Sequence, residues 1–235
     1  MPIREEPFVN GEYYHIYNRG VAKLPVFLKH RHYLRFERTI NYYSYYPKAI
    51  SFSHYLRLKM VSNITELDKL HKFIPNQLVE LICYCLMPNH FHFILKQVAD
   101  NGISNFMRNL GNSYTKYFNV INNRVGPVFQ GRFKAIHIES EYYLKHLSRY
   151  IHINPIEAGI CDLQTIIDYP YSSLSQYVSN SPAGTLICKP KIILDQFGKG
   201  EFSYSSFCQN LADYGSTVSS LKKLTLDIDQ LPVLV

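Results

Sequence analysis

The sequence of 235 residues contains no tryptophan. It also has no uninterrupted apolar run that approaches the ~20 residues needed by a membrane-spanning helix. The first ten residues, MPIREEPFVN, are too polar for a signal peptide. The five cysteines are scattered and show neither the spacing of zinc ligands nor a disulfide framework, so we expect free thiols in a reducing compartment. These absences predict a soluble, cytoplasmic protein without a membrane partner.

Acidic residues are fewer than basic ones, 18 against 25, which leaves a net charge of +7. A positive balance suits a polyanion such as nucleic acid, although many unrelated proteins share it. Aromatic residues are abundant, with 20 tyrosines and 14 phenylalanines. Between His30 and Tyr46 tyrosines alternate with basic residues, a combination suited to base stacking beside phosphate contacts. A stripe of tyrosines that simply face the core explains the same pattern.

The most informative motif is the histidine pair His90 and His92 in MPNHFHFIL. The apolar and aromatic residues around it predict a strand, on which both histidines face one side and Phe91 faces the other. The segment 87–89 predicts a tight turn after the apolar run from Leu78 to Leu86, and therefore a hairpin. Two imidazoles at this spacing can bind one divalent ion, and we expect them to line an open cleft. A satisfied core histidine is the commoner alternative.

A second polar group lies at helical spacing in LSRYIHINPIEAG. Ser140 is a typical helix N-cap, and Pro155 predicts that the helix ends near Asn154. His146, Tyr150 and Asn154 follow one another at intervals of four, so we expect them to share one helix face. A tyrosine one turn from a carboxamide is suited to act as a nucleophile beside a metal ligand. The alternative is a core or surface tyrosine before an Asn-Pro that ends the helix.

The order of predicted elements is βαββαβ, followed by the helix that carries Tyr150. Strands are expected over 12–19, 78–86, 90–95 and 133–138, and helices over 26–46 and 103–122. This order is the ferredoxin-like pattern, an α+β fold with helices on one face of an antiparallel sheet. We expect one domain over 1–178, with an insertion near 49–76. A C-terminal extension over 179–235 follows, with short helices predicted between Lys191 and Tyr214.

Several of these motifs occur together and in a fixed order. CYCLMPNHFHFIL, PVFQGRFKAI and YIHINPIEAG followed by YPYSSLSQY resemble the single-tyrosine HUH transposases, especially the REP-associated and IS200-like types. The resemblance runs from about Tyr13 to Tyr177. It implies the HUH endonuclease fold and a DNA transposase that nicks and rejoins single-stranded DNA. Members of this family keep the 5′ end of the DNA as a phosphotyrosine.

The resemblance also implies roles for individual residues. His90 and His92 correspond to the metal-binding pair, with Mg²⁺ or Mn²⁺ as the ion, and Tyr150 corresponds to the nucleophile. The third ligand, a carboxamide one turn after the tyrosine, corresponds to Asn154. Many relatives carry glutamine there, so the shorter side chain departs from the family pattern.

Three further residues of the same helix are candidates for the chemistry. His146 is a candidate general base, although a solvated helix face explains it as well. Tyr142 and Tyr143 are rival nucleophiles, but neither has a carboxamide four residues later.

Basic residues near the predicted tyrosine helix are candidates for DNA binding. Arg132 and Lys134 alternate on a predicted strand, so we expect both to contact the DNA backbone near the scissile phosphate. Arg108, Lys116 and Arg124 are more distant candidates. The expected partner is single-stranded DNA flanked by a hairpin, which implies a nucleoid location in the bound state. A second copy of the chain, in a homodimer, is a further candidate partner.

Two alternatives to this function are compatible with the sequence. One is a non-catalytic nucleic-acid-binding module on the same fold, in which the histidines are structural. The other is an HUH nickase of the replication or conjugation type. Convergence of Tyr150, His90 and His92 on one site would favour a nuclease over the binding module.

Overall fold

The computed structural model describes residues 7–45, 50–61, 77–179, 186 and 188–210. Four strands form one antiparallel sheet in the order β2-β3-β1-β4. They are β1 (Tyr13–Arg19), β2 (Val79–Met87), β3 (His90–Gln97) and β4 (Lys134–His137). This strand order, with two crossover helices, is the ferredoxin-like arrangement, so the predicted fold class is confirmed.

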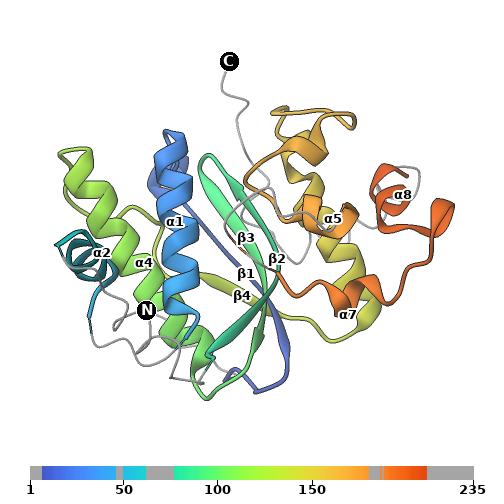
Figure 1. Cartoon of the computed structure of the whole chain (residues 1–235), viewed down its shortest axis with the longest axis horizontal. Helices are drawn as coiled ribbons and strands as arrows, with labels where there is room; N and C mark the ends of the chain where they lie inside the picture. Colours follow the sequence, from blue (N-terminus) through green and yellow to red (C-terminus); the bar gives the residue numbers. More distant parts are fainter. Residues whose placement is uncertain (1–6, 46–49, 62–76, 180–185, 187, 211–235) are drawn as a thin grey trace.

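Helices cover both faces of the sheet (Figure 1). On one side lie α1 (His30–Tyr43), α2 (Phe52–Val61) and α4 (Gly102–Ile121). On the other lie α5 (Glu141–Glu157), α6 (Leu174–Val178), α7 (Lys191–Leu194) and α8 (Tyr204–Gln209). Short 3-10 turns span Val21–Lys23, Ile166–Asp168 and Gly200–Phe202. The crossover helices α1 and α4 share one face as predicted, and α5 adds a layer to the second face. No helix in the described ranges has the length and apolar character required to cross a membrane.

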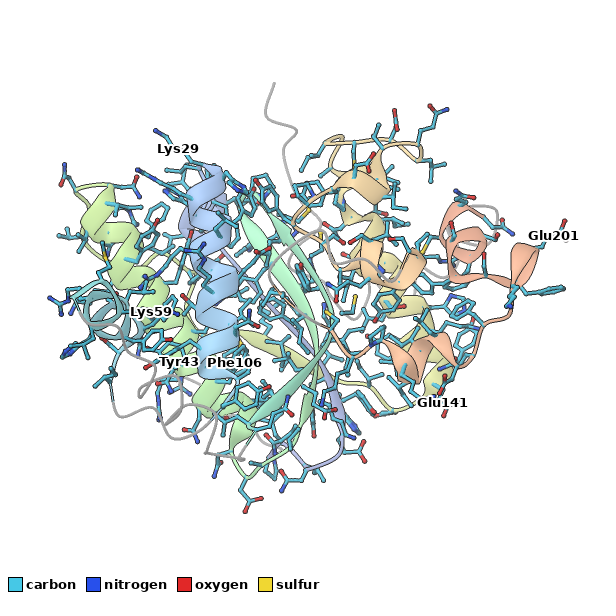
Figure 2. The ribbon with its side chains drawn as sticks, in the orientation of Figure 1. Lys29, Tyr43, Lys59, Phe106, Glu141 and Glu201 are labelled. Carbon is cyan, nitrogen blue, oxygen red and sulfur yellow. The ribbon has the colours of Figure 1, made fainter. Side chains whose placement is uncertain are left out.

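Each face of the sheet therefore has its own hydrophobic core. The side chains of Tyr43 and Phe106 lie on the α1 side, whereas Glu141 and Glu201 lie on the α5 side (Figure 2). Strands β2 and β3 are buried on both faces, which explains why their sequences are apolar almost throughout.

The hairpin between β2 and β3 fixes the direction of the two histidines. Met87 pairs with His90, so Pro88 and Asn89 form the predicted tight turn. Phe91 is buried and lies 5.3 Å from Phe36 of α1, between ring centroids. Burial of such a ring contributes about 1.5–3 kcal/mol. Side chains alternate on a strand, so the packing of Phe91 against α1 places His90 and His92 on the opposite face, toward α5.

Helix α5 starts where the sequence predicts and ends later. Ser140 is the N-cap, and its hydroxyl oxygen accepts a hydrogen bond from the Tyr143 backbone N–H at 3.1 Å. The predicted end near Asn154 is wrong, because the helix continues to Glu157 with Pro155 inside it. Proline removes one backbone donor, but the helical hydrogen bonds continue beyond it, and the Ala158 N–H donates to the Asn154 carbonyl at 3.0 Å. The extra turn keeps Asn154 inside the helix.

The predicted insertion and extension are partly described. Helix α2 occupies the first part of the insertion, and residues 62–76 lie outside the described residues. Helices α7 and α8 fall in the predicted extension, whereas 180–185 and 211–235 lie outside the described residues. Residues of both α7 and α8 join the hydrophobic core beneath α5. The domain boundary at 178 stays a prediction.

A buried histidine of α5 contacts side chains from several segments of this second layer. His152 of α5 is fully buried; its Nδ1 lies 2.7 Å from the Tyr204 hydroxyl, and its Nε2 lies 2.7 Å from Ser173 Oγ. The Cys83 thiol of β2 lies 3.3 Å from the same Nε2. Burial lowers the pKa of His152 to about 3, so the folded protein holds it neutral.

This burial predicts a loss of stability in acid. Below pH 6.5 the unfolded chain protonates His152 and the folded chain does not, until the pH approaches 3. The free energy of unfolding therefore decreases as the pH is lowered through this window. For this residue the decrease is about 2 kcal/mol by pH 5. The free energy of unfolding, measured with denaturant between pH 5 and 8, should depend less steeply on pH in His152→Gln than in the wild type. The difference in slope should correspond to about one proton taken up on unfolding. The control His54→Gln, at an exposed position of α2, should keep the wild-type slope. An unchanged slope in His152→Gln would contradict the assignment.

Candidate metal and nucleophile site

The two histidines of β3 lie close together under α5. His90 is 1% exposed and His92 is 0% exposed, and their ring centroids are 5.1 Å apart. His90 Nδ1 lies 2.6 Å from Asn89 Oδ1, and its Nε2 lies 3.2 Å from Asn154 Oδ1. Burial lowers the pKa of His90 to about 4, against the raising effect of Asn154, so the imidazole is neutral near pH 7.

These contacts leave an atom pair that a cation would satisfy. A neutral imidazole has one N–H, and the shorter contact assigns it to Nδ1, which donates to Asn89 Oδ1. With this tautomer, His90 Nε2 keeps its lone pair 3.2 Å from Asn154 Oδ1. A bound cation could take both atoms as ligands.

His92 supplies a further unsatisfied atom. Its Nδ1 lies 2.9 Å from Nε2 of His15, and its buried Nε2 has no hydrogen-bond partner among the described residues. Burial, with smaller effects of His90 and His15, lowers the pKa of His92 well below its ordinary value. An uncharged imidazole with an available lone pair is the form that binds metal.

Tyr150 of α5 completes the cluster. Its ring centroid is 5.8 Å from that of His92, with the two rings nearly perpendicular. Tyr150 is 0% exposed and its hydroxyl is buried. The expectation of an open cleft is therefore wrong for this structure. The reason is that Leu147 and Ile151, beside Tyr150 on α5, pack into the core on this face of the sheet.

The rival tyrosines at the start of α5 have different surroundings. Tyr142 is 65% exposed, and its ring lies 4.3 Å from that of His146. The Tyr143 hydroxyl is buried without a hydrogen-bond partner among the described residues. Burial raises the pKa of Tyr143 to about 12, with a smaller contribution from Tyr17.

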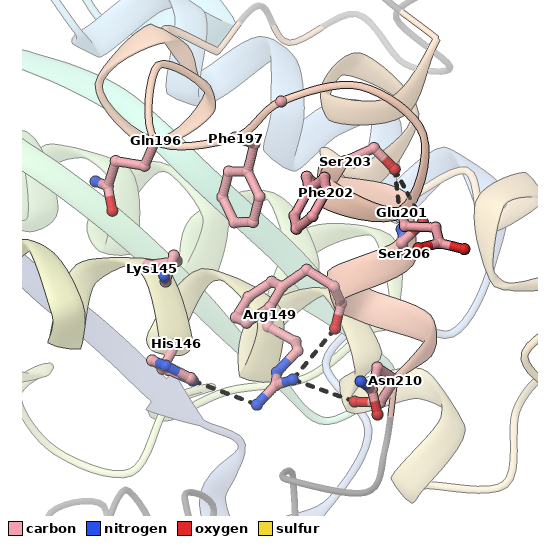
Figure 3. A pocket seen from close by; sticks show the side chains of 12 residues that line it. Lys145, His146, Arg149, Gln196, Phe197, Glu201, Phe202, Ser203, Ser206 and Asn210 are labelled. Carbon is pink, nitrogen blue, oxygen red and sulfur yellow. Dashed lines mark hydrogen bonds between the residues drawn. The ribbon is translucent and has the colours of Figure 1, made fainter.

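His146, the candidate base, lies elsewhere (Figure 3). It lines a pocket of about 310 Å³ between α5 and residues 196–210. Its Nδ1 lies 3.3 Å from Arg149 Nη2, and its ring lies 5.2 Å from that of Phe207. The prediction that His146 shares one helix face with Tyr150 and Asn154 is wrong for His146. Positions four apart on a helix are rotated by about 40°, so His146 and Asn154, which are eight apart, are rotated by twice that angle.

The basic candidates fall into two groups. Lys134 and Arg132 are exposed. Lys134 pairs with Tyr17 on β1, and Tyr17 pairs with His92 on its other side, so Lys134 and His92 lie on the same face. Burial, and then the charge of Arg19, lower the pKa of Lys134. Arg132 precedes β4, which is shorter than predicted.

The second basic group lies on the opposite side of the sheet. Arg108 and Lys116 are exposed on α4, and Arg124 follows that helix. Arg124 is held locally, because its guanidinium donates to Asn119 Oδ1 at 3.0 Å and to the Pro127 carbonyl at 2.7 Å. The sheet separates α4 from the histidine pair.

Sequence reasoning missed the contribution of β1. His15 contacts His92 directly, and Arg19 pairs with His90 across the β1–β3 ladder. Strand alternation was the available signal, because His15, Tyr17 and Arg19 occupy every second position of the predicted first strand.

In the described ranges, no three or more histidine, cysteine, aspartate or glutamate side chains are grouped to hold a metal ion. A carboxamide is a further kind of side chain whose oxygen can bind a cation. The Asn154 side chain, 3.2 Å from His90 Nε2, is placed to supply one.

Comparison with known proteins gives a match to a family model and a shared fold. Residues 55–154 match the family model described as "Transposase IS200 like". A solved structure of a REP-associated tyrosine transposase bound to a REP hairpin is similar, with a TM-score of 0.51 and 15% identity. The match covers 86% of this chain and 97% of that one, and at this identity it shows a shared fold. None of the curated proteins compared with the chain matches its sequence.

Fold and site together define a ferredoxin-like protein in which a histidine pair on the sheet faces a tyrosine on a covering helix. Residues 55–154 match the IS200-like transposase family model, in agreement with the resemblance seen in the motifs of the chain. This match supports a transposase role, and with it DNA cleavage as the class of reaction.

Proposed function

We propose that the chain nicks and rejoins single-stranded DNA through Tyr150, with a divalent ion held by His90, His92 and Asn154. The observation that carries the proposal is the proximity of these four side chains, contributed by one strand and one helix. Ring centroids separate His90 from His92 by 5.1 Å and His92 from Tyr150 by 5.8 Å. In a non-catalytic binding module the histidines would only fill the core. That role does not account for a buried His92 Nε2 without a hydrogen-bond partner among the described residues, beside Tyr150.

The residues present fit a hard divalent ion such as Mg²⁺ or Mn²⁺. Two neutral imidazoles and one amide oxygen add no negative charge, which suits a site that must also accept a phosphate. When bound, the ion would act as a Lewis acid on the phosphodiester.

The proposed chemistry of the chain's own groups is a transesterification. The Tyr150 oxygen attacks phosphorus and forms a Tyr–O–P bond, the P–O3′ bond breaks, and the 3′ oxygen leaves and takes a proton from water to become a hydroxyl. The tyrosine proton must pass to a base or water, because the reference pKa of tyrosine is about 10. His146 lies at the separate pocket, so we assign this step to no side chain. Since the Tyr150 hydroxyl is buried, we infer that α5 shifts from the sheet when DNA enters.

The proposed DNA path runs along the open edge of the sheet. Arg132 and Lys134 are exposed there, and the charge of Arg19 lies near enough to lower the pKa of Lys134. Two cations at the β4 edge and Arg19 on the neighbouring strand β1 suit phosphate contacts, which position a nucleic acid without reading its sequence. The similar solved structure holds a REP hairpin, which supports a hairpin-flanked strand as the partner here. We propose only distant contacts with the DNA for Arg108, Lys116 and Arg124.

The proposal is tested by incubating the whole chain with single-stranded oligonucleotides from the flanks of its own gene, with Mn²⁺ or with a chelator. We expect a covalent protein–DNA adduct on a denaturing gel with Mn²⁺ and none with the chelator. DNA binding without any adduct across these flanks would contradict the proposal and favour the non-catalytic module.

A further inference from the structure

We propose that His15 is a positioning residue for His92: it accepts the Nδ1 proton of His92 and so directs the Nε2 lone pair of His92 at the metal position. This inference rests on the proposed function. It concerns a residue of β1 that lies outside the histidine pair and outside α5.

The contact is direct and enclosed. His15 Nε2 and His92 Nδ1 are 2.9 Å apart, and both side chains are 0% exposed. Their rings are nearly parallel, 16° apart, with centroids separated by 5.1 Å. Tyr17 lies against both rings, 4.8 Å from His15 and 5.9 Å from His92 between centroids. These neighbours leave the His92 ring little freedom to turn.

Counting hydrogens leaves two arrangements of this pair. In the first, His92 Nδ1–H donates to His15 Nε2, and His92 Nε2 keeps a lone pair. His15 then carries its own proton on Nδ1, a buried atom without a hydrogen-bond partner among the described residues. In the second, His15 Nε2–H donates to His92 Nδ1, and His92 carries its own proton on Nε2. Only the first can bind a metal through Nε2. The ion would give this nitrogen the partner that it lacks among the described residues, and so would favour the first arrangement.

Histidines that bind metals are generally held in this way by a second group at the other ring nitrogen. Loss of such a group typically costs about 10–100-fold in metal affinity. An uncharged imidazole acceptor, in place of a carboxylate, keeps the site free of negative charge. This matches the neutral ligand set of His90, His92 and Asn154.

Two substitutions separate the acceptor from the volume of the ring. His15→Phe keeps a ring but removes the acceptor, whereas His15→Gln supplies an amide oxygen that can accept from His92 Nδ1–H. Mn²⁺ affinity of the whole chain without DNA, measured by electron paramagnetic resonance of the free ion, should fall about 10–100-fold in His15→Phe. His15→Gln should stay within a few-fold of the wild type.

The variant His92→Ala distinguishes the failure of this inference from the failure of the metal site. If the wild type binds Mn²⁺, His92→Ala does not, and His15→Phe binds like the wild type, the metal site stands and the role of His15 is overturned. If the wild type binds Mn²⁺ no better than His92→Ala does, both are overturned.

A measurement on the wild type covers the case in which His15→Phe does not fold. Long-range ¹H–¹⁵N correlation of the histidine rings, on a diamagnetic Mg²⁺-loaded sample, reports which nitrogen of His92 carries the proton. We expect the Nδ1–H form. An Nε2–H form would overturn the proposal.

Discussion

Replacing Tyr150 with phenylalanine should abolish the covalent protein–DNA adduct and leave folding and single-strand binding intact. The change removes only the hydroxyl, while the ring keeps its contact with His92 and its place in the core beneath α5. Loss of a nucleophile leaves no bond-forming atom at this position, so we expect a fall in rate on the order of 10³-fold or more. A denaturing gel measures the adduct, and fluorescence anisotropy measures DNA binding.

A matched control is available on the same helix. Tyr143→Phe removes another buried hydroxyl from α5, near Tyr17 instead of His92. This variant should form the adduct at close to the wild-type rate. Peptide mapping should place the DNA on Tyr150 in both the wild type and the control. An adduct mapped to Tyr143 or to the exposed Tyr142 would overturn the assignment while leaving the reaction class intact.

The parts of the site that the sequence predicted are those set by local rules. Strand alternation placed His90 and His92 on one face, and the Pro88–Asn89 turn placed them at the start of the second hairpin strand. Helical spacing placed Asn154 one turn after Tyr150. Each inference involves residues within a few positions of one another, where backbone geometry fixes direction before any tertiary contact forms.

The parts that it did not predict depend on contacts distant in sequence. His15 meets His92 because β1 pairs with β3 in a register that sets Tyr17 opposite His92, and the residue spacing within either segment does not encode this register. His146 is turned to a pocket formed with residues 196–210, from a segment whose packing the sequence did not reveal. The extra turn of α5 past Pro155 reflects burial of that residue, which outweighs the local preference of proline.

The buried state of the site has a consequence for access. A phosphodiester cannot reach the Tyr150 hydroxyl while α5 packs on the sheet, yet a small hydrated ion needs far less space than DNA. Metal binding and DNA binding are therefore expected to be separable in this chain. Substitutions in the histidine pair can accordingly be assayed on the metal alone.

Replacing His90 with alanine should abolish both Mn²⁺ binding and adduct formation. The substitution removes one of three proposed ligands and leaves Asn154 Oδ1 facing a cavity in place of an imidazole. Loss of a supporting group typically weakens metal affinity about 10–100-fold, so loss of the ligand itself should exceed that range. Titration calorimetry with Mn²⁺ measures the affinity, and circular dichroism checks the fold. The control His137→Ala, whose exposed side chain on β4 contacts Glu12, should bind Mn²⁺ like the wild type.

Free imidazole separates a lost ligand from a damaged fold. The cavity in His90→Ala has the shape of the missing ring, and Asn89 Oδ1 remains to accept a hydrogen bond from the added molecule. Millimolar imidazole should therefore restore part of the Mn²⁺ binding and part of the adduct in this variant, with no effect on Tyr150→Phe. Full metal-dependent activity of His90→Ala without imidazole would rule out the metal role of this histidine. A folded variant that binds no Mn²⁺ and regains it with imidazole would identify His90 as a ligand.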